Sequence, residues 1–198
     1  MKKAFSLVEI SIVLFMLTAV LFAVVPFSIS NVKQAKLTAE WKSYMEQVSY
    51  SFETLDEYKK INNLDKKSSI ERLMHYLDAK PLIDKNELQN YKYKMLNGNF
   101  YQKMNLDKFD DIYIDVDKKL IGVEYSSDNK KIATIWTDLN GVKKPNIVGK
   151  DIFIYEIGND FVSPYGKELK IEAVKSDCSR YGTGMTCSQF YIIGGDLK

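Results

Sequence analysis

Histidine is nearly absent from this chain, which has one such residue, His75, among 198. With a single imidazole, histidine-based zinc sites and Ser-His-Asp machinery are not expected. The sequence also contains no G-x-S-x-G or H-E-x-x-H motif, and Gly182-Thr183-Gly184 lacks the Lys-Ser/Thr of a phosphate-binding loop. We therefore expect a protein that is not an enzyme.

A strong excess of charge is also missing, because 28 basic and 26 acidic residues leave a formal net charge of +2. Nucleic-acid-binding domains usually carry a marked basic excess, so no nucleic-acid partner is expected. Charge is scarcest at the beginning, where residues 1–30 contain only Lys2, Lys3 and Glu9. The average composition therefore combines a polar domain at 31–198 with a very different N-terminal segment.

That segment is a long apolar run from Phe5 to Phe27, with one charged residue in 23. As a helix it would be about 35 Å long, which is enough to cross a hydrocarbon core of about 30 Å. Lys2 and Lys3 precede it, so the positive-inside rule places the N-terminus in the cytoplasm and the polar domain outside. The sequence predicts a transmembrane helix over 5–30.

A cleaved secretory signal and a plain membrane anchor are simpler interpretations of the same run. Glu9 interrupts the run near its start, and no A-x-A-like exit follows it, which disfavours a secretory signal. A carboxylate near a bilayer core costs about 2.5–3.5 kcal/mol and marks a candidate functional site. No Lys or Arg occurs between Lys3 and Lys33 to pair with Glu9. A cut before Phe5 would supply a cation, because a free α-amino group has a pKa of about 8.

The sequence Lys3-Ala4-Phe5-Ser6-Leu7-Val8-Glu9, followed by the apolar run, resembles the processing signal of type IV pilins and type II secretion pseudopilins. The resemblance implies that a prepilin peptidase cuts between Ala4 and Phe5, that Phe5 is methylated, and that Glu9 acts in assembly. It also implies a helix kink at Pro26. The chain departs from the family in having Ala4 where Gly is usual.

The function implied by this resemblance is that of a structural subunit, which loses its leader at 1–4 and assembles through its hydrophobic helix. The assembly would be a type IV pilus or a type II secretion pseudopilus. Its partners would be other pilin or pseudopilin subunits, prepilin peptidase, an inner-membrane assembly platform and the lipid bilayer. The alternative is a single-pass, membrane-anchored extracytoplasmic binding protein that does not polymerise.

Apolar residues at steps of three and four predict an amphipathic helix over 31–60. The stripe consists of Leu37, Trp41, Tyr44, Met45, Val48, Phe52 and Leu55. A polar, variable insert follows at 61–110. Within it, Ser68 and Glu71 have the spacing of a capping box and predict a short helix that ends before Pro81.

From residue 111 the apolar period changes to two, which predicts strands at 111–116, 120–125, 132–136 and 152–157 and a short one at 190–193. Turn residues between the first three favour an antiparallel meander. The predicted fold class is α+β. A long N-terminal helical spine, transmembrane in its first half and amphipathic in its second, packs on a C-terminal antiparallel sheet within 111–198. The pilin resemblance implies the same fold.

Asp138, Asn140 and Asp151 are candidate calcium ligands in the loop at 137–151, because calcium takes six to eight oxygen ligands. The pilin resemblance adds that major pseudopilins bind calcium in a C-terminal loop. The full EF-hand pattern is absent, however, and three lysines in the loop oppose a cation. A long turn in which Asn140-Gly141 supplies a positive φ is the structural alternative.

Cys178 and Cys187 are the only cysteines, and no histidine accompanies them as a zinc ligand. Their spacing is not the C-x-x-C of redox enzymes. Outside the membrane the compartment should be oxidising, where disulfides persist. We predict a structural disulfide, with the surface around Arg180 and Tyr181 as a candidate contact area.

Overall fold

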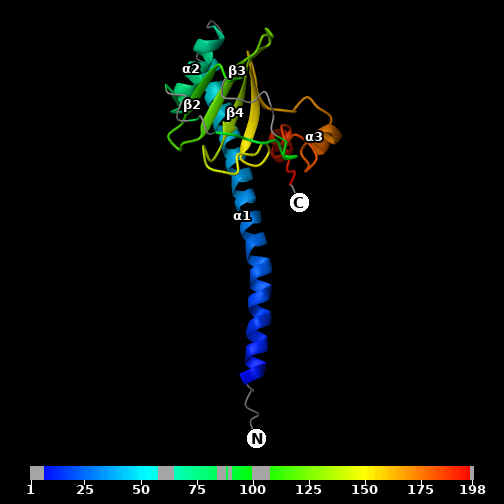
Figure 1. The fold of residues 1–198 in the computed structure, drawn as a ribbon. Coiled ribbons are helices and arrows are strands. Elements are labelled where there is room, and N and C mark those ends of the chain that lie inside the picture. The colour runs from blue at the N-terminus through cyan, green and yellow to red at the C-terminus, as the bar shows by residue number, and fades with distance from the viewer. Residues whose placement is uncertain (1–6, 58–64, 84–87, 89–90, 100–107, 197–198) are drawn as a thin grey trace. The chain divides into compact units, whose positions relative to one another are not determined.

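The computed structural model describes residues 7–57, 65–83, 88, 91–99 and 108–196 (Figure 1). Side chains at 23, 25–31, 56 and 57 are not part of that description. The chain divides into two units, residues 1–36 and 37–198, and each is described by itself. The predicted leader at 1–4 lies outside the described residues.

The first helix, α1, extends over Leu7–Glu57 and is helical at Pro26 as on either side of it. A proline inside a helix removes one amide donor and favours a bend, so the kink at Pro26 stays a prediction. The expected spine to residue 60 agrees with α1 as far as Glu57, and 58–60 lie outside the described part.

An antiparallel sheet of six strands in chain order forms the centre of the second unit, which confirms the predicted meander and the α+β class. Its strands are β1 (Lys80–Pro81), β2 (Asp111–Ile114), β3 (Leu120–Tyr125), β4 (Lys131–Asp138), β5 (Ile152–Gly158) and β6 (Val162–Pro164). The two edge strands β1 and β6 were not predicted, because two and three residues are too few to show an alternating pattern. Each contains a proline, which is typical of sheet edges.

The predicted apolar stripe of α1 packs on one face of this sheet. Figure 1 shows β2, β3 and β4 in front of the cyan part of α1. Trp41 is fully buried, its ring stacks on that of Phe153 at 4.9 Å between centroids, and its Nε1 donates to the carbonyl of Ser188 at 2.9 Å. Every other member of the stripe is buried except Leu37, which is half-buried. The amphipathic helix is therefore confirmed.

The other face of the sheet is also covered, and part of the insert at 61–110 does this. Tyr93, Met95 and Phe109 pack with the sheet residues Ile112 and Trp136 in a second apolar cluster. With a core on each face, the central strands bury nearly every side chain, as in the consecutive buried residues that begin β5. The variable insert is thus structural where it is described.

The short helix in the insert is α2 (Lys66–Tyr76), and its predicted start at Ser68 is wrong by three residues. Asp65 is the N-cap, and its carboxylate accepts from the Ser68 amide at 2.9 Å and from the Ser68 hydroxyl at 2.9 Å. Asp and Ser are equally good N-caps. The sequence predicted Ser68 as the N-cap, whereas Asp65 has that position and Ser68 donates to it. His75 is exposed on α2, as expected of a surface residue.

Two short helices, α3 (Ile171–Asp177) and α4 (Cys187–Ile192), complete the second unit. The predicted strand at 190–193 is wrong, because residues 190–192 lie in α4 and Ile193 is its C-cap. A helical turn places Cys187 and Tyr191 on one side, and both are buried in the core that contains Trp41. Tertiary packing has overridden the strand preference of these residues.

Candidate functional site

The predicted processing and assembly residues lie at the start of the chain. Ala4 and Phe5 are outside the described residues. Glu9 lies in the first turn of α1 and is exposed. A carboxylate near a helix N-terminus interacts favourably with the helix dipole. It would also be one helical turn from an amine at Phe5, as the sequence predicts.

Apolar side chains cover the whole circumference of α1 in the first unit. The six consecutive residues from Ile12 to Leu17 are each at least 51% exposed. Because neighbours on a helix are about 100° apart, these six encircle it. A helix that is apolar all round is normally buried in a protein core or a membrane, so this surface is suited to an apolar environment.

Hydroxyl groups in the same segment are satisfied inside the helix. Ser11 donates to the carbonyl of Leu7 at 2.9 Å, and Thr18 donates to that of Phe15 at 2.8 Å. Such bonds leave few side-chain polar groups that need water. They allow this stretch to lie against apolar neighbours.

Among the residues that the structure describes, no helix combines the length and the apolarity needed to cross a membrane. The helix predicted at 5–30 includes positions outside that description, namely residues 5 and 6 and the side chains at 23 and 25–30.

The three candidate calcium ligands do lie together, but the carboxylates of Asp138 and Asp151 are engaged by N–H donors. Asp151 is fully buried and accepts from the amides of Asn146 at 2.7 Å and Ile147 at 2.6 Å. It also accepts from the side-chain amide of Asn140 at 3.1 Å. Asp138 accepts from the Asn140 backbone amide at 3.2 Å. Each of these donors points a positive hydrogen at the carboxylate.

Burial raises the pKa values of both carboxyl groups, Asp138 and Asp151. Burial raises the pKa of Asp138 to about 8; the charge of Asp151 adds to this increase, while the hydrogen bond from Tyr91 opposes it. Burial also raises the pKa of Asp151, against the hydrogen bonds from Ile147, Asn146 and Asn140. Asp138 is therefore readily neutralised by a proton.

The residues present do not fit calcium. Between Asp138 and Asp151, the described buried side-chain oxygens that accept no hydrogen bond are the neutral amide oxygens of Asn140 and Asn146. Two such oxygens are far fewer than the six to eight ligands that calcium takes. In the described part of the chain, no group of three His, Cys, Asp or Glu side chains is placed to hold a metal. Gly141 has a φ of +67°, as the structural alternative of a long turn requires.

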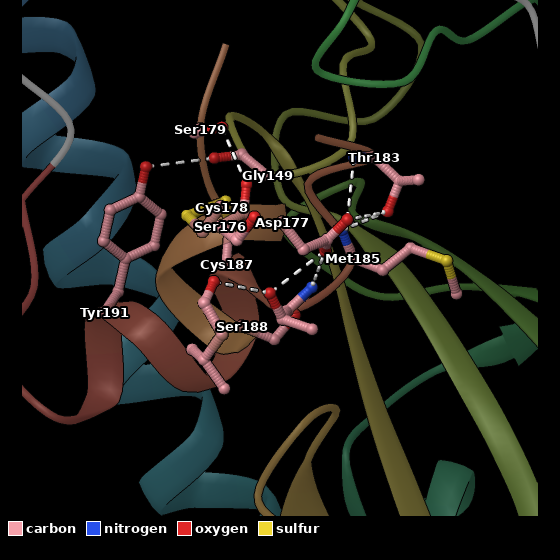
Figure 2. The surroundings of a disulfide bond; sticks show 12 residues. Gly149, Ser176, Asp177, Cys178, Ser179, Thr183, Met185, Cys187, Ser188 and Tyr191 are labelled. Atoms are coloured by element: carbon pink, nitrogen blue, oxygen red, sulfur yellow. Dashed lines mark hydrogen bonds between the residues drawn. A yellow bond between two sulfur atoms is a disulfide. The ribbon is translucent and has the colours of Figure 1, made fainter. Parts of the chain in front are cut away.

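The predicted disulfide is confirmed: Cys178 and Cys187 are bonded, with 4.8 Å between their Cα atoms (Figure 2). Asp177, next to Cys178, holds the enclosed loop. Its carboxylate accepts from the backbone amides and the hydroxyls of Thr183 and Thr186 at 2.6–3.0 Å. Burial raises the pKa of Asp177, but these hydrogen bonds outweigh it and hold the pKa below its usual value.

The tip of this loop presents the two residues that the sequence singled out. Tyr181 is exposed, and the guanidinium of Arg180 lies 4.6 Å from the centre of its ring. They form an exposed polar-aromatic tip.

Sequence reasoning did not identify Asp177 or Tyr91 as residues that hold these two loops. Asp177 had a detectable pattern, since an Asp beside a cysteine is followed by Thr at six and nine positions further on. Tyr91 lies in the unassigned insert, 47 positions from its partner Asp138, and no local pattern reveals so distant a contact.

The chain was compared with protein-family models, with curated proteins and with solved structures, and no match was found in any of the three.

Proposed function

We propose that this protein is a pilin-like structural subunit. It is cleaved between Ala4 and Phe5 and assembles through its apolar helix into a filament of the type IV pilus or type II secretion pseudopilus kind. Before assembly the apolar segment lies in a membrane with the N-terminus in the cytoplasm. Residues 37–198 are the displayed domain.

The observation that carries the proposal is the apolar surface all round the first part of α1, with a carboxylate in its first turn. Inside a bilayer, helices gain little from hydrophobicity when they associate, because lipid tails are equally apolar. A pair between Glu9 of one subunit and the amine of Phe5 in another would instead fix their axial offset. A membrane anchor that does not assemble would bear the cost of a carboxylate in the bilayer without this gain.

The disulfide supports an extracytoplasmic position for the second unit. Structural disulfides persist in oxidising compartments and are rare in the cytosol. The Cys178–Cys187 bond joins the C-cap of α3 to the first residue of α4 and lies in the core that contains Trp41. This agrees with the orientation that Lys2 and Lys3 predict.

Replacing Glu9 by alanine tests the proposal. We expect Glu9→Ala to insert into membranes and to begin at Phe5 like the wild type, while filament yield falls at least about tenfold, because the partner of the terminal amine is lost. Sheared filaments are quantified by immunoblot, and N-termini are read by mass spectrometry.

Ser11→Ala is the matched control, since it removes another polar group from the same helix, one that bonds within its own turn. It should assemble normally. Normal filaments from Glu9→Ala would refute the assembly role. A native chain that keeps residues 1–4 would favour the membrane-anchored, non-polymerising alternative.

A further inference from the structure

A groove lies between α1 and the edge strand β6 in the second unit. One part of it has a volume of about 410 Å³, and a second part of about 230 Å³ shares the lining residues Ser49, Glu53 and Val162 with it. The two parts therefore form one continuous depression. We call it the edge groove.

The edge groove has an apolar floor and a mainly acidic rim. Met45, Val162, Pro164 and Ile192 contribute the apolar surface. The rim carries three carboxylates and one ammonium group, from Glu46, Glu53, Asp160 and Lys42. The three acidic residues are exposed. The groove is therefore suited to a ligand that combines apolar and basic groups.

A second surface of the same chain has the opposite character. It is built by the β2–β3 turn and the β4–β5 loop, which touch so closely that a Cβ on Gly141 would lie 2.3 Å from the carbonyl oxygen of Lys118. Val116 and Val142 are 73% and 60% exposed there. We call this surface the basic knob; its residues are Val116, Lys118, Val142, Lys143 and Lys144, all exposed.

The acidic groups near the basic knob are largely engaged. Asp117 pairs with the ammonium of Lys119 at 2.7 Å, and Asp115 pairs with it at 3.1 Å. Asp138 and Asp151 are buried beneath the β4–β5 loop and accept hydrogen bonds there. Asp115 and Asp117 share one ammonium group and so keep one negative charge between them. Lys118, Lys143 and Lys144 carry three positive charges, so the knob stays net positive.

We infer that the basic knob of one copy of this chain docks in the edge groove of the next copy. Apolar groups meet an apolar floor, and lysines meet a carboxylate rim. Knob and groove share no residue, so the contact is heterologous and leaves one free knob and one free groove on each pair. Contacts of this kind propagate into open chains when the rotation between copies does not close a ring.

The inference rests on the proposed function, since it describes how the displayed domains of neighbouring subunits meet in the filament. It is separate from the packing of the apolar helices. Its test is therefore a cross-link between displayed domains, read alongside filament yield in the same cells.

In the experiment, two full-length variants are co-produced, one with Lys144→Cys and the other with Glu53→Cys. The two native cysteines are bonded to each other and do not interfere. Mild oxidation of sheared filaments should give a disulfide-linked dimer of the two variants. Replacing Lys144→Cys by Ile83→Cys, at a position 95% exposed and outside the knob, should give no dimer above background.

Charge reversal makes the test specific. Adding Lys118→Glu and Lys143→Glu to the first variant should lower the cross-link about tenfold, because like charges then face each other. Adding Glu46→Lys and Asp160→Lys to the second variant should restore most of it. Lys167→Glu with Lys175→Glu, on exposed lysines outside the knob, is the matched control and should change nothing.

Filaments that form without a cross-link between positions 144 and 53 would overturn the inference and leave the proposed function standing. So would a cross-link that is unaffected by charge reversal. If the processed wild type forms no filaments, the proposed function fails, and a cross-link in the same membranes would show the contact to be independent of it.

Discussion

Asp138 is a buried carboxyl group whose surroundings favour its neutral form. Only 2% of the residue is exposed, and its pKa is raised to about 8 from an ordinary value of 3.8. The folded state therefore binds this proton more tightly than the unfolded state does. The stabilisation is fully present below about pH 4 and is lost as the pH rises towards 8.

Asp138→Asn should therefore flatten the pH dependence of stability. The asparagine oxygen still accepts hydrogen bonds but does not titrate. Between about pH 5 and pH 8 we expect the free energy of unfolding of the wild type to fall by at least about 1 kcal/mol more than that of the variant. Urea unfolding of the full chain in detergent measures this, with the exposed Asp196→Asn as control. Parallel pH profiles for Asp138→Asn and the wild type would contradict the prediction.

Calcium should not stabilise the protein, since the carboxylate of Asp151 already faces three N–H donors. A ligand present at 100 times its dissociation constant adds about 2.7 kcal/mol, which raises the midpoint of thermal unfolding by several degrees. We expect millimolar calcium or excess chelator to shift that midpoint by less than about 1 °C. A clear increase that magnesium does not reproduce would be the opposite result.

At the scale of elements, Trp41 is the largest fully buried side chain by which α1 packs on the sheet. Trp41→Ala removes a fully buried ring, its stacking on Phe153 and its hydrogen bond to Ser188. Large-to-small changes of this kind cost about 3–5 kcal/mol. Denaturant unfolding should show this loss, whereas the half-exposed Tyr76→Ala should cost about 0.5 kcal/mol or less. Equal effects of the two would refute the central position of Trp41.

The disulfide between Cys178 and Cys187 is a second contact that holds elements together. Its two cysteines are nine positions apart. Closing this loop lowers the entropy of the unfolded chain and so stabilises the folded state by about 2–3 kcal/mol. Cys178→Ser with Cys187→Ser should lower the free energy of unfolding by that amount, and reductant should have no further effect on the variant. Ser179→Ala, in the same loop, is the control. An unchanged stability of the double variant would contradict this account.

The sequence predicted those elements in which local pattern and tertiary packing agree. The strands β2 to β5 alternate or repeat apolar residues over enough positions to be recognised, and the α1 stripe has a regular step. The strand predicted at 190–193 was wrong because its apolar residues follow one another as in a buried strand. In the structure, the disulfide at Cys187 and the core contact with α1 go with a helical turn instead. The apolar cluster on the second face of the sheet was not predicted, because Tyr93 and Phe109 lie in a polar insert. At the candidate site, the disulfide was predictable from two cysteines, whereas cleavage at Ala4 and Phe5 remains a prediction.

At the scale of the whole molecule, the proposal places residues 37–198 outside the cytoplasm. Ile83→Cys puts a single free thiol at a position that is 95% exposed, since the native cysteines are bonded. A membrane-impermeant maleimide should label it equally before and after cell lysis. Labelling that requires lysis would place the domain in the cytoplasm and contradict the proposed orientation.

The hydrogen bond from Trp41 to Ser188 spans 147 positions of the chain, and this has a consequence in time. Ribosomes add about 5–20 residues per second, so Trp41 waits roughly 7–30 seconds for its last neighbour to be made. During that interval the strands of the meander can pair in the order of their synthesis, since each needs only the strand before it. Trp41 is thus made before every other buried core residue described, and its hydrogen bond to Ser188 can form only when nearly the whole chain has been made.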